Sequence, residues 1–524
     1  MTVVADSLDN ESDVQPTDEA RQHAQDMNLR RVAMYASAIT LVGYGLCQVF
    51  RLVQNVVVSR FVAPDIFGVF TMLNICLQGL FMFSDLGVGP SIVQHKDGDK
   101  REFLNTAWTI QIVRSCILWA VTCLVAFPFA HFYNNSAYLW LLPLTGFAAM
   151  LDGLTSTTVF TAQRRLLVGR LVALDVAAQL LGSIAACVWA YHYPTPVALL
   201  SASLVAMGFR MVVSHFLIRG SIPNRLCWDQ KAFDDVFAFG KWILISAVVA
   251  FFAMQVDKLM LGKLITETQL GLYGVAIAIS NLPVVLMQKI CANVLHPWLA
   301  EYQRDSGDRM RAQFRTVRGT LLMIALFLVM GVYACSTTFF EVVYDPSYHG
   351  AGAIAKMLAV SVWISAVTAT VVRVVFVIGD SRVLATSSLV KFVATGIVSL
   401  FCFLQWGLPG FIAGLVIGNV LGYFVLLYSL RSHQLGCLWQ DVRYSALFLV
   451  MALAVDYGGT YVNRMLLTLP SVADVSLPMI SEKASIGELG VSVTVCLMAA
   501  VLVAYKGLQL SADRKMSAEK ISKV

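Results

Sequence analysis

The sequence predicts an all-α, polytopic membrane protein of about fourteen transmembrane helices. Of its 524 residues, 58% are hydrophobic and only 13% are charged, whereas soluble domains are about 45–50% apolar and about 25% charged. Apolar stretches of about 20 residues, the length that crosses a hydrocarbon core, recur along the chain. So few charges cannot cover a water-soluble surface, so the bilayer is the expected solvent.

The chain begins with a polar, acidic segment, residues 1–31, which we expect to be a disordered cytoplasmic tail. It has neither a basic n-region nor a cleavage site, so it does not resemble a secretory signal peptide. The first apolar stretch after Arg30 and Arg31 is therefore expected to direct insertion.

The apolar stretches predict spans in chain order along the rest of the sequence. The thirteenth is the weakest, because Asp456, Gly458 and Gly459 interrupt it. The predicted spans are 32–58, 66–94, 103–130, 136–162, 168–192, 196–219, 236–262, 270–299, 314–341, 351–379, 382–405, 409–430, 443–463 and 486–508.

The distribution of basic residues predicts the orientation. If the N-terminus is cytoplasmic, roughly two thirds of the 38 Lys and Arg, Arg318 among them, fall in cytoplasmic segments. The opposite side holds only Arg60, Lys263, Arg464 and Lys483. The positive-inside rule therefore predicts that both termini are cytoplasmic.

Two segments of the sequence echo one another at an offset of 203 residues. Residues 59–70, at the end of the first span, align with residues 262–273, at the end of the seventh. The basic residue, the glycine and the final aromatic coincide. This predicts two parallel halves, although apolar segments can also resemble each other by chance. Transporters with such halves place their site between them, near mid-membrane.

The same segments carry motifs of a known family. Residues 59–107 resemble the N-terminal signature of bacterial polysaccharide-export flippases, the polysaccharide and O-antigen branch of the multidrug/oligosaccharidyl-lipid/polysaccharide exporter superfamily. Residues 257–262 and 270–273 resemble its signature around helices 7 and 8, and Pro297 follows where the family commonly has a proline. The motifs are Arg60-Phe61, Phe67-Gly68, Ser84-Asp85-Leu86-Gly87, Val93-Gln94, Leu104-Asn105-Thr106-Ala107, Asp257-Lys258-Leu259-Met260-Leu261-Gly262 and Leu270-Gly271-Leu272-Tyr273.

The resemblance implies two six-helix bundles in a V around a central cavity. They would occupy 32–232 and 233–432, followed by helices 13–14 within 433–508 and a cytoplasmic tail at 509–524. It implies a flippase of the bacterial inner membrane that moves undecaprenyl-diphosphate-linked oligosaccharide repeat units to the periplasmic leaflet by alternating access, for exopolysaccharide, O-antigen or capsule synthesis. The implied partners are the lipid-linked oligosaccharide, the membrane, and glycan polymerase and export machinery. Nucleic acid, cofactors and metals are not implied.

A sugar diphosphate needs a hydrated, cationic path, because bare charge is costly to bury in hydrocarbon. Span 32–58 carries a polar stripe on one helical face, and the fork of Arg51 suits phosphate oxygens. Alternatively, Arg51 reaches the outer interface or pairs structurally. The stripe consists of Tyr44, Gln48, Arg51 and Asn55.

Further charged residues lie within the spans. Lys258 is expected to line the cavity. Arg114, Arg210 and Lys289 are expected to line it or to snorkel to the cytoplasmic interface. Lys356 and Arg373 are expected to snorkel, and Lys391 is a secondary cavity candidate. The carboxylates expected to couple an ion or to pair between the bundles are Asp85, Asp152 and Asp257, and for Asp257 an interbundle ion pair is favoured. Asp152 and Asp175 could also pair with Arg114 or Arg210.

Small and reactive residues predict structure rather than catalysis. Glycines at 410, 414, 418 and 422 predict close helix approach. The eleven cysteines form no CxxC pair, and no Walker A or HExxH motif occurs, so we expect no enzyme. A drug or metabolite antiporter of the same superfamily, with fewer cavity cations, and an integral-membrane glycan polymerase or ligase, with a large periplasmic loop, are the alternatives.

Overall fold

The computed structural model describes residues 18–84, 88–94, 98, 100–165, 167–217, 224–295, 299, 307–432 and 436–467. Regular structure in these ranges is helical. The first half contains α1 (Asp18–Ser59), α2 (Pro64–Ser84), α3 (Val88–Gln94), α4 (Arg101–Tyr133), α5 (Tyr138–Gly153), α6 (Thr158–Arg164), α7 (Val168–His192) and α8 (Pro196–Ser214). The rest contains α9 (Gln230–Leu264), α10 (Glu267–Ser280), α11 (Leu282–Ile290), η1 (Cys291–Leu295), α13 (Gly307–Val343), η2 (Pro346–Tyr348), α14 (Gly350–Ile378), α15 (Ser381–Ser432) and α16 (Leu438–Leu467).

The prediction of a polytopic, all-α membrane protein is confirmed. Ten helices are long and apolar enough to cross a membrane, or eleven if α5 and α6, bent by 54°, form one span. The first thirteen predicted spans each have a helical counterpart. The fourteenth, the tail at 509–524 and residues 1–17 lie outside the described residues. Helix α1 begins at Asp18, inside the segment expected to be a disordered tail.

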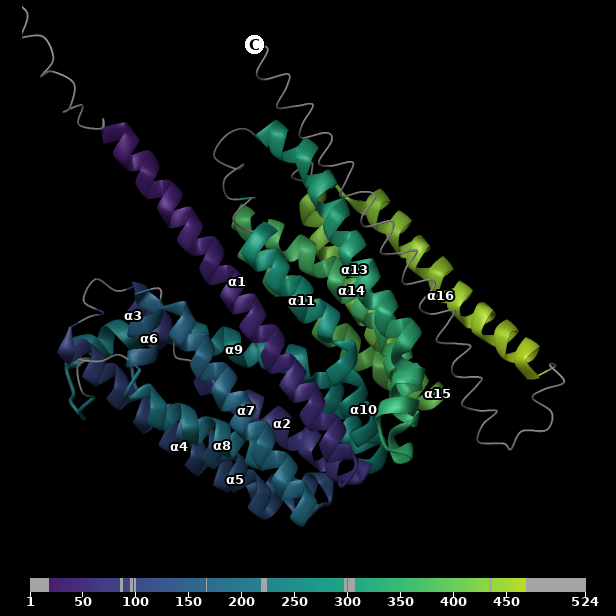
Figure 1. Ribbon diagram of the computed structural model, residues 1–524, viewed down its shortest axis with the longest axis horizontal. Coiled ribbons are helices and arrows are strands. Elements are labelled where there is room, and N and C mark those ends of the chain that lie inside the picture. Colours follow the sequence, from purple (N-terminus) through teal and green to yellow (C-terminus); the bar gives the residue numbers. More distant parts are fainter. Residues whose placement is uncertain are drawn as a thin grey trace, which may run out of the picture.

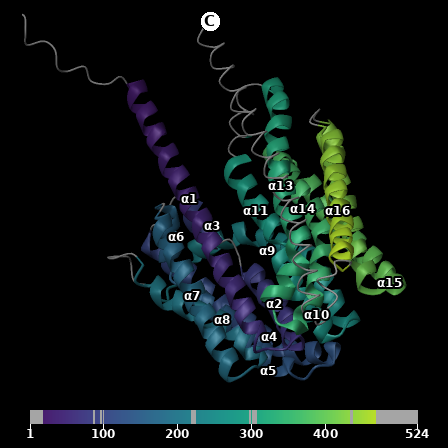
Figure 2. The same ribbon diagram turned by 45° about the vertical axis from the view of Figure 1, so that its right-hand side comes forward.

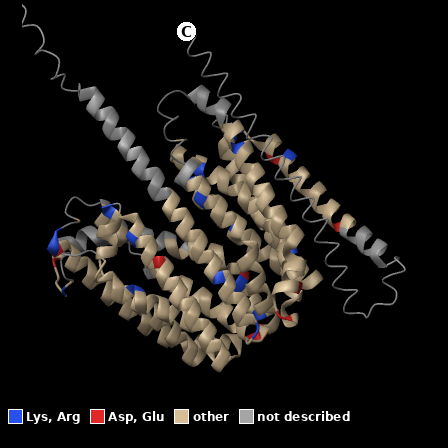
Figure 3. Ribbon diagram, in the orientation of Figure 1, with Lys and Arg blue, Asp and Glu red and all other residues tan. Residues whose placement is uncertain are grey.

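Two bundles share the chain, one built from α1–α8 and one from α9–α15 (Figure 1). Figure 2 shows the same division from another side. The bundles meet most extensively where α2 packs against α10. Charged residues are sparse along the described helices, which suits apolar surroundings (Figure 3).

Local sequence explains where several helices begin and end. Thr266 and Gln269 form a capping box that starts α10. Gly379, with φ of 87°, ends α14. Gly407 has φ of 63° and lies two residues before Pro409, so α15 bends back there as two antiparallel helices. These two halves correspond to the predicted spans 382–405 and 409–430.

The internal echo has a physical counterpart where α2 crosses α10. A Cβ atom on Gly68 would lie 2.0 Å from the carbonyl oxygen of Glu267. A Cβ atom on Gly271 would lie 1.8 Å from the carbonyl oxygen of Pro64. Replacing each residue by its counterpart 203 positions away in the other half turns the first contact into the second, so the two halves touch reciprocally, as around a two-fold axis. Only glycine permits this approach.

Hydrogen bonds close the bundles along the same end of the molecule, which we call the seam. Arg60 Nη2 donates to the Val343 carbonyl at 2.9 Å, and Tyr348 Oη donates to the Val62 carbonyl at 2.5 Å. Asn135 Nδ2 donates to Glu267 Oε1 at 2.5 Å. All these residues lie in or beside the turns after α1, α4, α9 and α13, so the seam is at the end of α1 opposite its N-terminus.

Exposed loop groups at the seam are also ordered. Ser347 donates from its backbone N and its hydroxyl to Asp345 Oδ1, at 3.0 and 2.7 Å. These hydrogen bonds, with the nearby positive charge of Arg60, hold the pKa of Asp345 below its usual value.

Candidate functional site

A cavity of about 590 Å³ lies within the C-terminal bundle, and its lining residues fall between 253 and 423 in the chain. Helices α9, α10, α11, α14 and α15 supply its walls. Among the residues that the structure describes, three basic side chains and one carboxylate line it: Lys258, Arg373, Lys391 and Asp257. Its neutral polar lining comes mainly from Asn281, Gln288, Ser361, Ser365, Thr368, Asn419 and Tyr423.

The three cations occupy successive depths in the bundle. The end of α14 and the start of α15 adjoin in the chain and so lie on the same side of the bundle. With a rise of 1.5 Å per residue, Arg373 is roughly 8 Å from the end of α14, and Lys391 is roughly 15 Å from the start of α15. Lys258 is roughly 9 Å from the seam end of α9. The positive charges therefore form a path that leads from one side of the bundle towards the seam.

The deep end of this path is held by hydrogen bonds. Lys258 Nζ donates to Gln255 Oε1 at 2.7 Å, and Gln255 donates in turn to Gln78 of α2, across the two bundles. Asp257 Oδ2 accepts a hydrogen bond from Tyr273 Oη at 2.9 Å. Adjacent in the chain, Asp257 and Lys258 thus take different partners. The observed partner of Asp257 belongs to its own bundle.

The polar stripe of α1 lies elsewhere. Arg51 Nη2 donates to Gln179 Oε1 of α7 at 3.2 Å, and its side chain is exposed. Gln48 donates to Tyr44 Oη. Lys289 Nζ stands 5.2 Å from the centre of the Tyr44 ring, which brings α11 of the second bundle to α1 of the first.

Four other predicted site residues, Asn55, Arg114, Asp152 and Arg210, belong to helices of the N-terminal bundle. Arg210 Nη1 is 3.6 Å from Asp175 Oδ1, which fits the structural pairing considered for that arginine. Asp152 lies within the electrostatic influence of both Arg210 and Arg114. Asn55 is partly buried on α1. Asp85 lies outside the described residues.

Sequence reasoning did not anticipate the positions of Arg373 and Lys391. Arg373 was expected to snorkel towards the cytoplasm, yet it lines the cavity, and Lys391 ranked only second. The glycine series offered a signal, because Gly422 lies beside Lys391 in the folded hairpin. Both the series and the lysine were visible in the sequence, but the pairing of the two helices was not.

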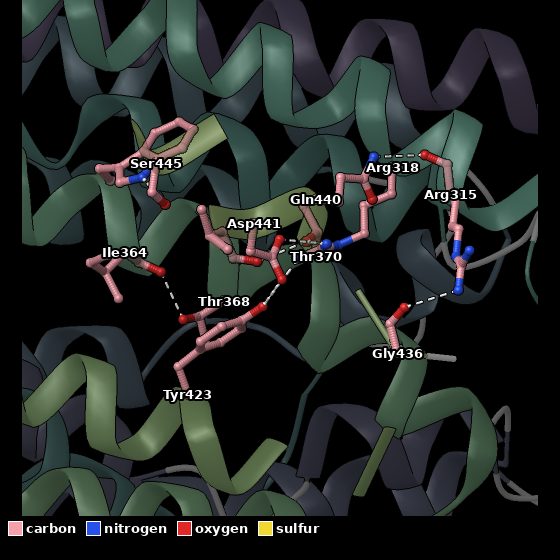
Figure 4. Close-up of polar contacts among 12 residues, drawn as sticks. Arg315, Arg318, Ile364, Thr368, Thr370, Tyr423, Gly436, Gln440, Asp441 and Ser445 are labelled. Atoms are coloured by element: carbon pink, nitrogen blue, oxygen red, sulfur yellow. Dashed lines mark hydrogen bonds and ion pairs between the residues drawn. The ribbon is translucent and has the colours of Figure 1, made fainter. Parts of the chain in front are cut away.

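A buried ion pair between Arg318 and Asp441 lies next to Tyr423, one of the residues that line the cavity (Figure 4). Arg318 Nη1 lies 2.5 Å from Asp441 Oδ1, and the two side chains are 0% and 6% exposed. Arg318 Nε also donates to Thr370 Oγ1 at 3.0 Å, and Tyr423 Oη donates to Asp441 Oδ2. One arginine thus joins α13, α14, α15 and α16, and Tyr423 carries this network to the cavity.

This pair corrects one element of the sequence analysis. Arg318 was counted among the cytoplasmic charges that set the orientation, but it is fully buried in α13. Further contacts also tie helix α16 to the bundle. Lys356 Nζ is 2.6 Å from Asp456 Oδ1, and Trp363 Nε1 donates to Ser445 Oγ at 3.0 Å. The thirteenth span therefore packs against the second bundle.

Comparison with known proteins places this architecture. The fold resembles the lipid II flippase MurJ in an inward closed conformation, with a TM-score of 0.65 at 14% identity over 89% of this chain and 98% of that one. It also resembles an inward-facing multidrug resistance MATE family transporter of the MOP superfamily, with a TM-score of 0.56 at 15% identity over 79% and 98% of the two chains. These likenesses confirm the expected fold of two bundles.

Sequence relatives are distant but consistent. The teichuronic acid biosynthesis protein TuaB of Bacillus subtilis (strain 168) is 20% identical over 53% of this chain and 57% of its own length. The lipopolysaccharide biosynthesis protein WzxC of Escherichia coli (strain K12) is 19% identical over 62% and 64%. The chain thus spans about six tenths of the curated relatives that it matches.

The family resemblance seen in the motifs is also confirmed by a family model. Residues 57–353, more than half of the chain, match the model described as "Polysaccharide biosynthesis protein". This range includes the seam glycines and Lys258. The chain therefore belongs to the polysaccharide biosynthesis protein family.

Proposed function

We propose that this protein is a flippase that moves an undecaprenyl-diphosphate-linked oligosaccharide from the cytoplasmic to the periplasmic leaflet of a bacterial inner membrane. Both termini then lie in the cytoplasm. The observation that carries the proposal is the cavity in the C-terminal bundle, where three cations face one carboxylate. The description of the family and the names of its distant relatives support polysaccharide biosynthesis as the setting.

The cavity has the chemistry that a diphosphate requires. Burying a phosphate charge in hydrocarbon is prohibitive without compensating partners. Arg373 can offer a bidentate fork, while Lys391 and Lys258 supply compact charges deeper in the bundle. The neutral amides and hydroxyls of the lining suit sugar hydroxyls, and the prenyl chain remains in lipid.

The position of the seam indicates which side of the membrane the closed end of the protein faces in the transport cycle. With the termini in the cytoplasm, the closed end of the molecule faces the periplasm, and Arg373 lies nearer the cytoplasmic side. The structure then corresponds to the state that loads substrate from the inside. Translocation requires the contacts between α2 and α10 to part while the cytoplasmic ends approach.

Complementation of a flippase-null strain tests the proposal. Arg373→Ala and Lys258→Ala are expected to reduce surface glycan while membrane abundance, followed by blot, stays normal. Arg443→Ala is the matched control, because Arg443 is exposed on α16 and does not line the cavity. Arg51→Ala tests whether the polar stripe of α1, in the N-terminal bundle, also contributes. Full glycan output from this variant would remove the α1 stripe from the mechanism. Full output from the cavity variants would contradict the proposal.

A further inference from the structure

The two halves of α15 pack with unusually close backbones, and the glycine series lies along their contact. Gly410, Gly414, Gly418 and Gly422 recur every fourth residue on the second half. A Cβ atom on Gly410 would lie 2.2 Å from the Cys402 carbonyl oxygen, and one on Gly414 would lie 2.3 Å from Ser399 Cα. The predicted close helix approach is therefore confirmed for this hairpin.

The last glycine of the series differs from the others in what it touches. A Cβ atom on Gly422 would lie 2.9 Å from the Cβ of Lys391 and 3.2 Å from the Ser387 carbonyl oxygen. The hydroxyl of Ser387 donates to the Gly422 carbonyl at 2.7 Å, which fixes the two segments together. The lysine stem thus lies directly against a glycine, where any side chain would displace it.

Lys391 and Gly422 both line the cavity. Among the residues that the structure describes, no carboxylate forms an ion pair with Lys391. Asp257 is the carboxylate whose charge acts on it, and that carboxylate accepts the hydrogen bond from Tyr273. The ammonium group is therefore available to an anion that enters the cavity.

We infer that Gly422 is a positioning residue, which sets the Lys391 ammonium where it binds the phosphate groups of a polyprenyl diphosphate. The inference rests on the proposed function. It adds Lys391 as a residue that contacts the substrate and Gly422 as a residue that acts through Lys391. It also gives the glycine series a role beyond helix packing: at its last position the close approach holds a charge in the cavity.

The rest of the chain supplies matched controls. Gly414→Ala introduces a carbon atom closer to its neighbour than Gly422→Ala does, but touches Ser399 rather than the lysine. Gly396→Ala lies in the same hairpin in open space. If the glycines served packing alone, Gly414→Ala would harm the protein more than Gly422→Ala in every assay.

A double-mutant cycle between Gly422→Ala and Lys391→Met tests the inference. The full-length protein in lipid nanodiscs is titrated with farnesyl diphosphate, and farnesol serves as the uncharged control. Each single variant is expected to weaken farnesyl diphosphate binding about tenfold, and the double variant no further. Lys391→Arg is expected to restore part of the affinity. Gly414→Ala, at equal folded abundance, is expected to bind like the wild type.

The outcomes separate the inference from the proposed function. If Gly422→Ala leaves binding unchanged, or weakens it equally in the Lys391→Met background, the positioning role is refuted while the flippase proposal stands. If the wild type binds farnesyl diphosphate no better than farnesol, the anion cavity itself is refuted. Equal losses of affinity in Gly422→Ala and Gly414→Ala would reduce the glycine to a packing role.

Discussion

The ion pair between Arg318 and Asp441 offers a sharp test of how α16 is held. We consider Asp441→Leu, which removes the carboxylate and leaves the guanidinium buried. Arg318 is 0% exposed, and the groups left beside it are neutral: the hydroxyls of Thr370 and Tyr423 and the thiol of Cys437. The phenol of Tyr423 also loses its acceptor. The variant should therefore loosen α16 and the cavity wall together.

The magnitude follows from burial. Removing one partner of a buried ion pair costs about 3–5 kcal/mol, because an uncompensated charge remains. For a bundle of roughly 200 residues, each kcal/mol lowers the melting temperature by about 2–4 °C, so a fall of at least about 6 °C is expected. Replacing both residues, as Arg318→Met with Asp441→Leu, removes the charge and should recover most of this loss.

The assay is thermal unfolding of the purified protein in detergent, followed by tryptophan fluorescence. The control is Lys356→Met, which breaks the other ion pair of α16. Its partners are 32% and 42% exposed, and pairs this exposed contribute about 0–1 kcal/mol. The control should therefore melt within about 2 °C of the wild type.

Two results would refute this reasoning. If Asp441→Leu melts like the control variant, the pair does not clamp α16. Alternatively, the double replacement could melt as low as Asp441→Leu alone. The loss would then come from packing around residue 441 rather than from a stranded charge.

Three other perturbations address the seam, the cavity charge and the core. Gly271→Ala puts a carbon 1.8 Å from the Pro64 carbonyl oxygen, where about 3.3 Å is a normal contact. It should raise the labelling, by an impermeant maleimide, of a cysteine introduced at the seam. Equal labelling in the Gly331→Ala control would contradict a seam closed by glycine. Asp257→Asn removes the one cavity carboxylate, so farnesyl diphosphate should bind about three- to tenfold tighter at low salt, with less gain at high salt; weaker binding would assign the carboxylate a direct role. Trp363→Ala deletes a side chain that is 1% exposed and should cost about 3–5 kcal/mol in the same melting assay, whereas a loss below about 1 kcal/mol would show that the core there is not tightly packed.

The sequence was sufficient for the helices and their duplication because both depend on local patterns. Span length and composition located the counterparts of α1 to α16, and a short echo anticipated the contact of Gly68 and Gly271. Helical periodicity also placed the glycines of α15 on one face. In each case, the signal lies within a few turns of one helix.

The site was harder to predict because it depends on how helices rotate and pair. Arg318 lies near a helix end and so looked cytoplasmic, but its partner Asp441 is far along the chain. In the sequence, Asp456 interrupts a weak span, whereas in the structure it forms an ion pair with Lys356 of α14. Arg51 and Lys391 have similar local surroundings in the sequence. Only the packing shows that Lys391 lines the cavity while Arg51 bonds to Gln179.

The most direct test of the anion cavity is translocation by the purified protein in liposomes. A fluorescent polyprenyl-diphosphate sugar is followed by quenching of the outer leaflet with an impermeant reductant. The wild type and Arg443→Met should exchange the probe between leaflets, and the triple variant Lys258→Met, Arg373→Met and Lys391→Met should fall to the rate of protein-free liposomes. Translocation by the triple variant at the wild-type rate would contradict the account.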